Sequence, residues 1–162
     1  KDIGSVFMPH GLGHLIGCDT HDVGGYIEGT PKRVREGPGV GKLRTSRILE
    51  QNMVMTSEPG CYFIDALLDK ALLDETKSVY FNVTKLQEMR GFGGVRLEDV
   101  VLVTETGMEN LTTTPRTIEE VESVRQGGVW PPLEDKAPEL KRTWYVLGPH
   151  GAGMVASPLS PK

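Results

Sequence analysis

The order of apolar and polar positions predicts a chain that alternates short strands with short helices. Pro59 and Gly60 interrupt an apolar stretch, which stops one strand and lets the next turn back along an antiparallel neighbour. The stretch 95–104 alternates at first and then becomes continuously apolar, the pattern of a strand buried on both faces. The predicted strands are 53–58, 61–64, 95–104 and 110–113.

Apolar residues at the helical period predict the helices. A stripe of four apolar residues follows Asp65, which is placed to cap the helix that carries them. Further along, Thr117 and Glu120 have the spacing of a capping box. Strands and helices together predict an α+β fold. The stripe consists of Leu67, Leu68, Ala71 and Leu72, and the predicted helices lie near 65–73, 83–90 and 117–125.

Bulk composition is that of an ordinary globular protein: 162 residues suit one domain, with 38% hydrophobic and 25% charged residues. A net charge of −4 and the lack of a basic stripe with interleaved aromatics argue against a nucleic-acid partner. No apolar run approaches the ~20 residues that span a bilayer, and no signal-peptide pattern is present. We therefore expect a soluble, cytoplasmic protein with no membrane partner. Cys18 and Cys61 lack CxxC spacing and are expected to be free thiols.

The composition changes towards the end of the chain. Residues 127–162 hold more than half of the eleven prolines and show little periodicity, which predicts a mostly disordered tail with Trp130, Trp144 and Tyr145 as weak contacts. Residues 1–126 are expected to form the folded part. Because the first residue is Lys rather than Met, and a histidine cluster begins only ten residues in, we expect the chain to be a fragment of a longer protein.

Three of the four histidines, His10, His14 and His21, lie within twelve residues of one another. Glycines interrupt this segment too often for a stable helix, so a strand-and-loop path is expected, with imidazoles that bind a metal or accept a proton. The alternative is three unrelated surface or core histidines. No HExxH motif is present, which removes the commonest helical zinc-protease interpretation.

Two carboxylates occupy positions where a charge is costly. Glu58 ends one predicted strand and Glu98 lies inside another, so each needs a cation or hydrogen bonds to compensate for lost hydration. Two carboxylates and a histidine suit Mn²⁺, Co²⁺ or Zn²⁺. The alternative is that Arg96 or Arg90 pairs with Glu98. A basic cluster at Lys32, Arg33 and Arg35 is expected to be a solvated surface rather than a binding patch.

The order of the motifs adds a resemblance. HGLGH, a following HD, then SEPG and VRLED resemble the pita-bread metallopeptidases, and four longer strings are similar to the Xaa-Pro dipeptidase (prolidase) family in particular: FMPHGLGH, DTHDVGGY, LRTSR and RGFGGVRLED. The resemblance covers roughly residues 5 to 125. It implies the C-terminal half of a pita-bread fold, with a curved, mainly antiparallel sheet and helices on one side.

The resemblance also implies a metal centre. His14 and Glu58 correspond to metal ligands, and Glu98 to the carboxylate that bridges two divalent ions, with manganese as the expected metal. Glu58 is also the expected proton acceptor, and Arg96 corresponds to the arginine beside the bridging glutamate. The implied reaction is hydrolysis of Xaa-Pro dipeptides by a metal-bound hydroxide.

Substrate contacts follow in the same way. His10 and His21 correspond to residues around the substrate and transition state, and are counted with Glu58 and Arg96 as catalytic. Arg44, in LRTSR, corresponds to the arginine that holds the dipeptide's C-terminal carboxylate, for which a planar fork of donors is well shaped. A homodimer is implied for the full-length parent.

One departure from the family pattern limits what this chain is expected to do. The family's two metal-binding aspartates lie upstream of the histidine segment, where this chain has only Asp2. We therefore expect at most one weakly bound ion and no activity from the chain alone. The alternatives are a non-catalytic pseudo-enzyme or interaction fragment and an aminopeptidase P-like metallopeptidase; an adaptor role for the Pro- and Trp-containing tail rests on less.

Overall fold

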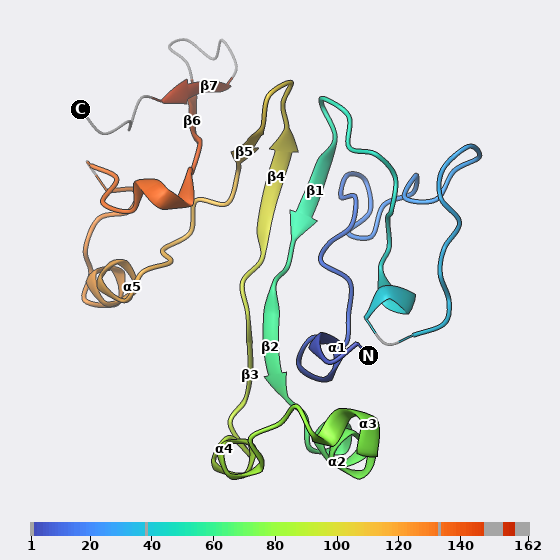
Figure 1. The fold of residues 1–162 in the computed structure, drawn as a ribbon. Helices are drawn as coiled ribbons and strands as arrows, with labels where there is room; N and C mark the ends of the chain where they lie inside the picture. The colour runs from blue at the N-terminus through green and yellow to red at the C-terminus, as the bar shows by residue number, and fades with distance from the viewer. Residues whose placement is uncertain (1, 38, 133, 148–153, 158–162) are drawn as a thin grey trace. The chain divides into compact units, whose positions relative to one another are not determined.

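The computed structural model describes residues 2–37, 39–132, 134–147 and 154–157. The chain divides into two compact units, one formed by Lys1–Leu49 with Val54–Glu98 and the other by Glu50–Met53 with Asp99–Lys162. Helices and antiparallel strand pairs occur in the chain, so the predicted α+β class is confirmed (Figure 1). The expected curvature, and the placing of all helices on one side, stay predictions.

The strands of the first unit are β1 (Val54–Ser57), β2 (Gly60–Phe63) and β3 (Gly93–Arg96). β2 and β3 pair antiparallel, with Gly60 opposite Arg96 and Phe63 opposite Gly93. β1 lies beside the histidine segment, where the Thr56 N–H donates to the carbonyl of His14 at 2.8 Å and the Glu58 N–H to that of Leu12 at 2.6 Å. The predicted absence of a helix from this segment is confirmed, but the path is a loop with one isolated bridge, Leu15 to Met55, rather than a strand.

The predicted strand 95–104 is wrong in its continuity and its burial. It is split into β3 and β4 (Asp99–Val103), because Pro59, opposite the interruption, has no N–H to donate to the ladder. β3 is exposed at every residue and Val95 keeps 54% of its surface, since two of the four residues are glycines without side chains and the strand pairs with β2 alone.

Short helices complete the first unit: α1 (Gly4–Phe7), α2 (Asp65–Leu73), α3 (Glu75–Ser78), α4 (Val83–Glu88) and the 3₁₀ turn η1 (Val40–Lys42). The predicted cap at Asp65 is wrong. Ile64 holds the capping position of α2 and makes no side-chain hydrogen bond there, because Asp65 is itself the first helical residue. Asn82 caps α4, accepting from the Lys85 N–H at 3.1 Å.

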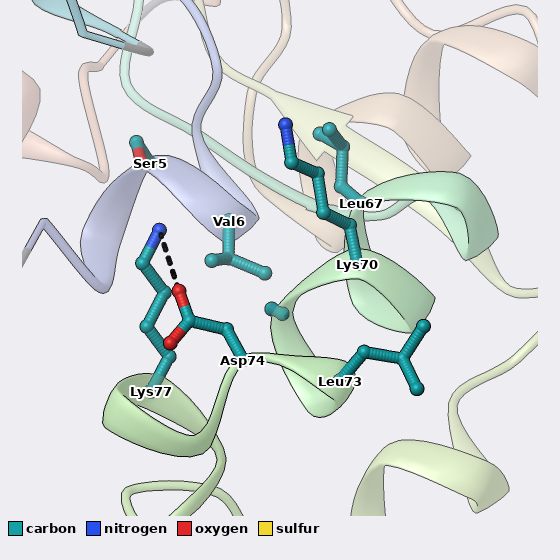
Figure 2. Close-up of a pocket in the computed structure, with 8 residues that line it drawn as sticks. Ser5, Val6, Leu67, Lys70, Leu73, Asp74 and Lys77 are labelled. Atoms are coloured by element: carbon teal, nitrogen blue, oxygen red, sulfur yellow. Dashed lines mark ion pairs between the residues drawn. The ribbon is translucent and has the colours of Figure 1, made fainter.

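The core of the first unit is small. Val6, Leu68, Ala71 and Leu86 are buried, and Phe7, Phe63, Leu72 and Phe81 pack against them. The predicted stripe on α2 is confirmed as core, since Leu68 is fully buried and Ala71 keeps only 4% of its surface. Beside this core lies a cavity of about 290 Å³ between α1 and α2, where Lys77 and Asp74 form an ion pair at 3.9 Å (Figure 2).

In the second unit, β4 pairs antiparallel with β5 (Met108–Asn110), and β6 (Trp144–Leu147) pairs with β7 (Met154–Ser157). Helix α5 (Ile118–Arg125) begins with the predicted capping box, in which the Glu120 N–H donates to the Thr117 hydroxyl at 3.2 Å. The strand predicted at 110–113 is wrong in its bounds. It ends at Asn110, whose side chain accepts the Thr112 N–H at 2.9 Å in place of a neighbouring strand. A 3₁₀ turn, η2, covers Pro138–Leu140.

A buried ion cluster also lies in the second unit. Arg142 donates to both carboxylate oxygens of Glu120, at 2.7 and 3.0 Å, and also pairs with Asp135. Hydrogen bonds from Arg142 hold the pKa of Glu120 at about 2, against an ordinary 4.5, although burial acts the other way. Trp130 and Trp144 flank the guanidinium at 5.6 and 5.3 Å. The division at residue 126 and the disorder of residues 127–162 stay predictions.

Within the described part of the chain, no helix is both long enough and apolar enough to cross a bilayer.

Candidate metal centre

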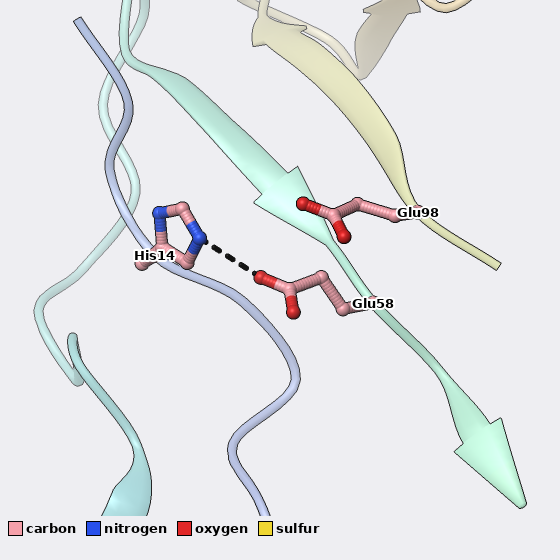
Figure 3. Close-up of side chains that lie close together, drawn as sticks. All are labelled: His14, Glu58 and Glu98. Carbon is pink, nitrogen blue, oxygen red and sulfur yellow. Dashed lines mark ion pairs between the residues drawn. The ribbon is translucent and has the colours of Figure 1, made fainter. Parts of the chain in front are cut away.

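His14 is buried beside Glu58, with Nε2 3.0 Å from Oε1 (Figure 3). The other ring nitrogen, Nδ1, lies 2.9 Å from the carbonyl of Leu15. A carbonyl can only accept, so Nδ1 carries a proton and Nε2 of the neutral ring presents a lone pair to the carboxylate. Two lone pairs that face each other at this distance need a shared proton or a cation between them.

Thr56 holds this pair in place. Its hydroxyl lies 2.8 Å from Glu58 Oε1 and 3.0 Å from the His14 N–H, and the side chain is almost fully buried at 1% exposure. The histidine segment reaches β1 because residue 13 is glycine: a Cβ there would lie 1.9 Å from the Thr56 carbonyl oxygen. Sequence reasoning missed Thr56 as a site residue. Its only signal was its position two residues before Glu58, on the same side of an alternating strand.

Glu98 reaches the same place through the register of the strands. In the antiparallel pair of β2 and β3, Gly60 lies opposite Arg96. The same register, continued by two residues, places Glu58 opposite Glu98. Ligand atoms of His14, Glu58 and Glu98 lie within 4.8 Å of one another, and the convergence predicted for them is confirmed. Like charges directly opposite destabilise a strand pair, so this arrangement calls for positive charge between the two carboxylates.

Part of that charge comes from Arg96, whose Nε is 3.7 Å from Glu98 Oε2 and 4.0 Å from Glu58 Oε2. The pairing of Arg96 with Glu98 that was considered as an alternative to metal binding is therefore present. Arg90 instead pairs with Asp65 and Asp69 on α2. Arg96 is about half exposed at 47% of its side chain, so it compensates the buried Glu58 only in part.

His10 and His21 flank the centre. His10 Nδ1 lies 2.7 Å from the carbonyl of Gly11, so in the neutral ring Nε2 accepts from the Tyr62 hydroxyl, 2.9 Å away. His21 is exposed, and its ring stacks edge-on against His14 with centroids 4.5 Å apart. Sequence reasoning also missed Tyr62, because a contact across 52 residues leaves no local signal.

These side chains line one cavity of about 460 Å³ in the first unit. The cavity wall includes the three histidines, a single carboxylate, Glu58, and four cationic side chains: Arg33, Lys42, Arg44 and Arg96. Arg44 lines this cavity, and its role in holding a substrate carboxylate stays a prediction. Arg33 was expected to lie on a solvated surface; it is exposed and lines this cavity, whereas Lys32 and Arg35 do not.

The donor set fits a divalent cation. One imidazole nitrogen and two carboxylates are ligands that suit Mn²⁺, Co²⁺ or Zn²⁺. His14 Nε2 and Glu58 Oε1 lie 3.0 Å apart, close enough for both to bind the same ion. Among the described residues, this is the one group of three or more potential ligands gathered around an ion-sized space.

Comparison with known proteins shows which family this chain is similar to. Residues 2–105 match the model of metallopeptidase family M24. Over 125 residues the chain is 58% identical to an Xaa-Pro dipeptidase of Rattus norvegicus and 56% identical to one of Homo sapiens; each match covers 77% of this chain and 25% of the relative. The low-pH form of aminopeptidase P from E. coli is 36% identical, with a TM-score of 0.46, over 75% of this chain and 20% of that one. The chain thus spans about a quarter of the length of these curated relatives.

Proposed function

Because the chain belongs to metallopeptidase family M24, we propose that it supplies part of a two-metal site that hydrolyses Xaa-Pro dipeptides. The substrate class comes from the relatives named Xaa-Pro dipeptidase. The observation that carries the proposal is the convergence of His14, Glu58 and Glu98 within 4.8 Å. In this proposal the three side chains would hold the metal, with Glu98, which faces Glu58 across the strands, as the carboxylate that two ions would share.

A bound divalent ion, with manganese as the expected metal, supplies a water of lowered pKa and polarises a carbonyl oxygen. The chain's own residues do the rest. Leu15 fixes the proton of His14 on Nδ1 and so keeps Nε2 free to bind. Thr56 donates a hydrogen bond to Oε1 of Glu58 and so fixes the orientation of this carboxylate, which would serve as the proton acceptor.

The remaining roles concern the substrate. Arg44 binds its C-terminal carboxylate through a fork of N–H donors. His10 and His21 lie around the substrate's peptide carbonyl, where His21 stabilises the charge that develops on it, and the Tyr62 hydroxyl sets the orientation of His10. Arg96 holds Glu98 and Glu58 in register and offsets their charge.

We further propose that the 162-residue chain is inactive on its own. Three ligands hold one ion weakly, and the second ion requires the two aspartates that the family resemblance assigns to a more N-terminal segment. The homodimer, the cytoplasmic location and the absence of nucleic-acid or membrane partners stay predictions for the full-length protein.

Metal titration of the chain, by calorimetry and by the Mn²⁺ electron paramagnetic resonance signal, tests the centre. We expect one weak site that is lost in Glu98→Gln, since this change removes the charge and keeps the shape. Glu75→Gln, an exposed glutamate in the first turn of α3, is the matched control and should bind like wild type. Equal binding by both variants would remove Glu98 from the ligand set.

Hydrolysis of Gly-Pro tests the catalytic part. The isolated chain should show no turnover with Mn²⁺ present, whereas a full-length protein that carries this segment should turn it over and should lose activity on Glu98→Gln. Turnover by the isolated chain, with contaminating enzyme excluded, would contradict the proposed need for further ligands. A full-length protein that binds no metal and cleaves nothing would favour the non-catalytic alternative.

A further inference from the structure

The cavity at the metal centre carries more positive charge than one carboxylate of a substrate would use. Arg96 is paired with Glu58 and Glu98. Within the described residues, no carboxylate lies within ion-pair distance of the other three cations of the wall, Arg33, Lys42 and Arg44. Three like charges that share one cavity repel one another, and an anion bound among them relieves that repulsion.

Local geometry brings two of these cations to the same side of the chain. Leu43, which lies between Lys42 and Arg44, has extended backbone (φ −60°, ψ 132°), and the two flanking side chains both line the cavity. Leu43 lies against Gly11, where an added Cβ would come within 2.5 Å of the leucine Cα. Lys42 and Arg44 therefore face the cavity together.

The third cation is tied to the same segment. Arg33 Nη2 donates to the carbonyl of Gly41 at 3.3 Å, and the guanidinium lies 5.8 Å from the centre of the Tyr26 ring. The Tyr26 hydroxyl in turn donates to the carbonyl of Leu43 at 2.9 Å. These contacts fix Arg33 beside the 41–44 segment although its side chain is exposed.

We propose that Arg33, Lys42 and Arg44 form an anion subsite that favours dipeptides with an acidic residue before the proline. The inference rests on the proposed function for the identity of the ligand as an Xaa-Pro dipeptide. Its C-terminal carboxylate pairs with Arg44, and a second carboxylate, on the side chain of Asp or Glu, pairs with the charges of Lys42 and Arg33. A neutral side chain leaves these two cations without a counter-charge.

The test compares Asp-Pro with Asn-Pro, which have nearly the same shape and differ by one charge. Binding to the 162-residue chain is measured by calorimetry and by backbone amide chemical shifts, in protein and buffer freed of metal by a chelating resin so that neither a metal nor a dissolved chelator takes part. At ~20 mM ionic strength we expect Asp-Pro to bind about tenfold more tightly, an effect between the Coulomb limits for water and for a protein surface. The ratio should approach one at ~1 M salt, where charges are screened within about 3 Å.

Variants locate the effect. Lys42→Met and Arg33→Met should each reduce the ratio to about threefold, and the double variant to about one. Lys32→Met and Arg35→Met are the matched controls, because both residues belong to the same basic loop, are exposed and do not line the cavity. They should keep the wild-type ratio. Far-UV circular dichroism checks that each variant folds like wild type.

The proposal would be overturned if wild type bound the two dipeptides with equal affinity. It would also be overturned if the Kd of both dipeptides were weaker than about 10 mM. An equal loss in the Lys32 and Arg35 variants would also overturn it, since the effect would then come from net charge. Failure of the metal centre is distinguishable: it appears in the Mn²⁺ titration and leaves the affinity ratio measured without metal unchanged.

Discussion

Arg142→Met should destabilise the second unit strongly. The guanidinium is buried, with 1% of its side chain exposed, between Glu120 at 10% and Asp135 at 6%. Loss of one partner from a buried ion pair costs about 3–5 kcal/mol, because the other charges stay buried without compensation. The pKa of Glu120 gives a similar magnitude: a shift from 4.5 to about 2 corresponds to about 3 kcal/mol at about 1.4 kcal/mol per pKa unit.

Tryptophan fluorescence during urea unfolding measures this effect. Trp130 and Trp144 are the chain's two tryptophans, and both flank Arg142, so their emission reports on this cluster alone. With a urea dependence of about 2 kcal/mol/M, a loss of about 3 kcal/mol lowers the midpoint by about 1.5 M, or unfolds the cluster in water if its stability is smaller. Arg125→Met is the control: it removes an arginine that is 71% exposed and pairs with Glu122 within α5, which should cost less than about 0.5 kcal/mol.

Coincident fluorescence transitions for the Arg142 and Arg125 variants would refute the reasoning. That result would mean that the buried cluster does not form in solution. It would also favour the prediction from composition that residues 127–162 are disordered, whereas a large, specific loss in the Arg142 variant would show that part of this segment is folded.

Three further predictions concern stability. The depressed pKa of Glu120 contributes stability that is fully present above about pH 4.5 and is lost as the pH falls towards about 2; the urea midpoint from tryptophan fluorescence should fall across this window in wild type, and a flat profile would contradict the ion pair. Gly13→Ala should disrupt the first unit because its Cβ would collide with the Thr56 carbonyl oxygen; unchanged amide protection from hydrogen exchange on β1 would count against this packing. Leu68→Ala, at a fully buried site, should cost about 2–5 kcal/mol, measured by circular dichroism in urea against Leu73→Ala, whose residue is 85% exposed; equal costs would exclude Leu68 from the core.

Local signals in the sequence predicted local structure well. The helix after Ile64 follows from an apolar stripe at the helical period, and the start of α5 follows from the capping-box spacing of Thr117 and Glu120. Each depends on residues within one or two turns of each other, so the information lies in the segment itself. The cap predicted at Asp65 was wrong by one residue. A side chain of the right type identifies a cap only once the first helical residue is known.

The geometry of the site depends on contacts between residues that are far apart in the sequence, which no single segment reveals. Glu58 and Glu98 were singled out as costly carboxylates, but their facing positions follow from a strand register fixed 40 residues apart along the chain. The hydrogen bond of Tyr62 to His10 and the approach of Arg33 to the cavity likewise depend on how separate loops fold together. Composition assigned Arg33 to solvent, and its exposure agrees, but exposure does not distinguish the wall of a cavity from open surface.

The facing carboxylates of Glu58 and Glu98 have a consequence for ion choice. Backbone pairing sets Glu58 and Glu98 opposite each other, with ligand atoms of the two within 4.8 Å, and Arg96 offsets their charge only in part. A divalent cation offsets the remaining charge more strongly than a monovalent one. The strand register therefore favours higher cation charge, and the choice among divalent elements depends on His14 and the remaining ligands.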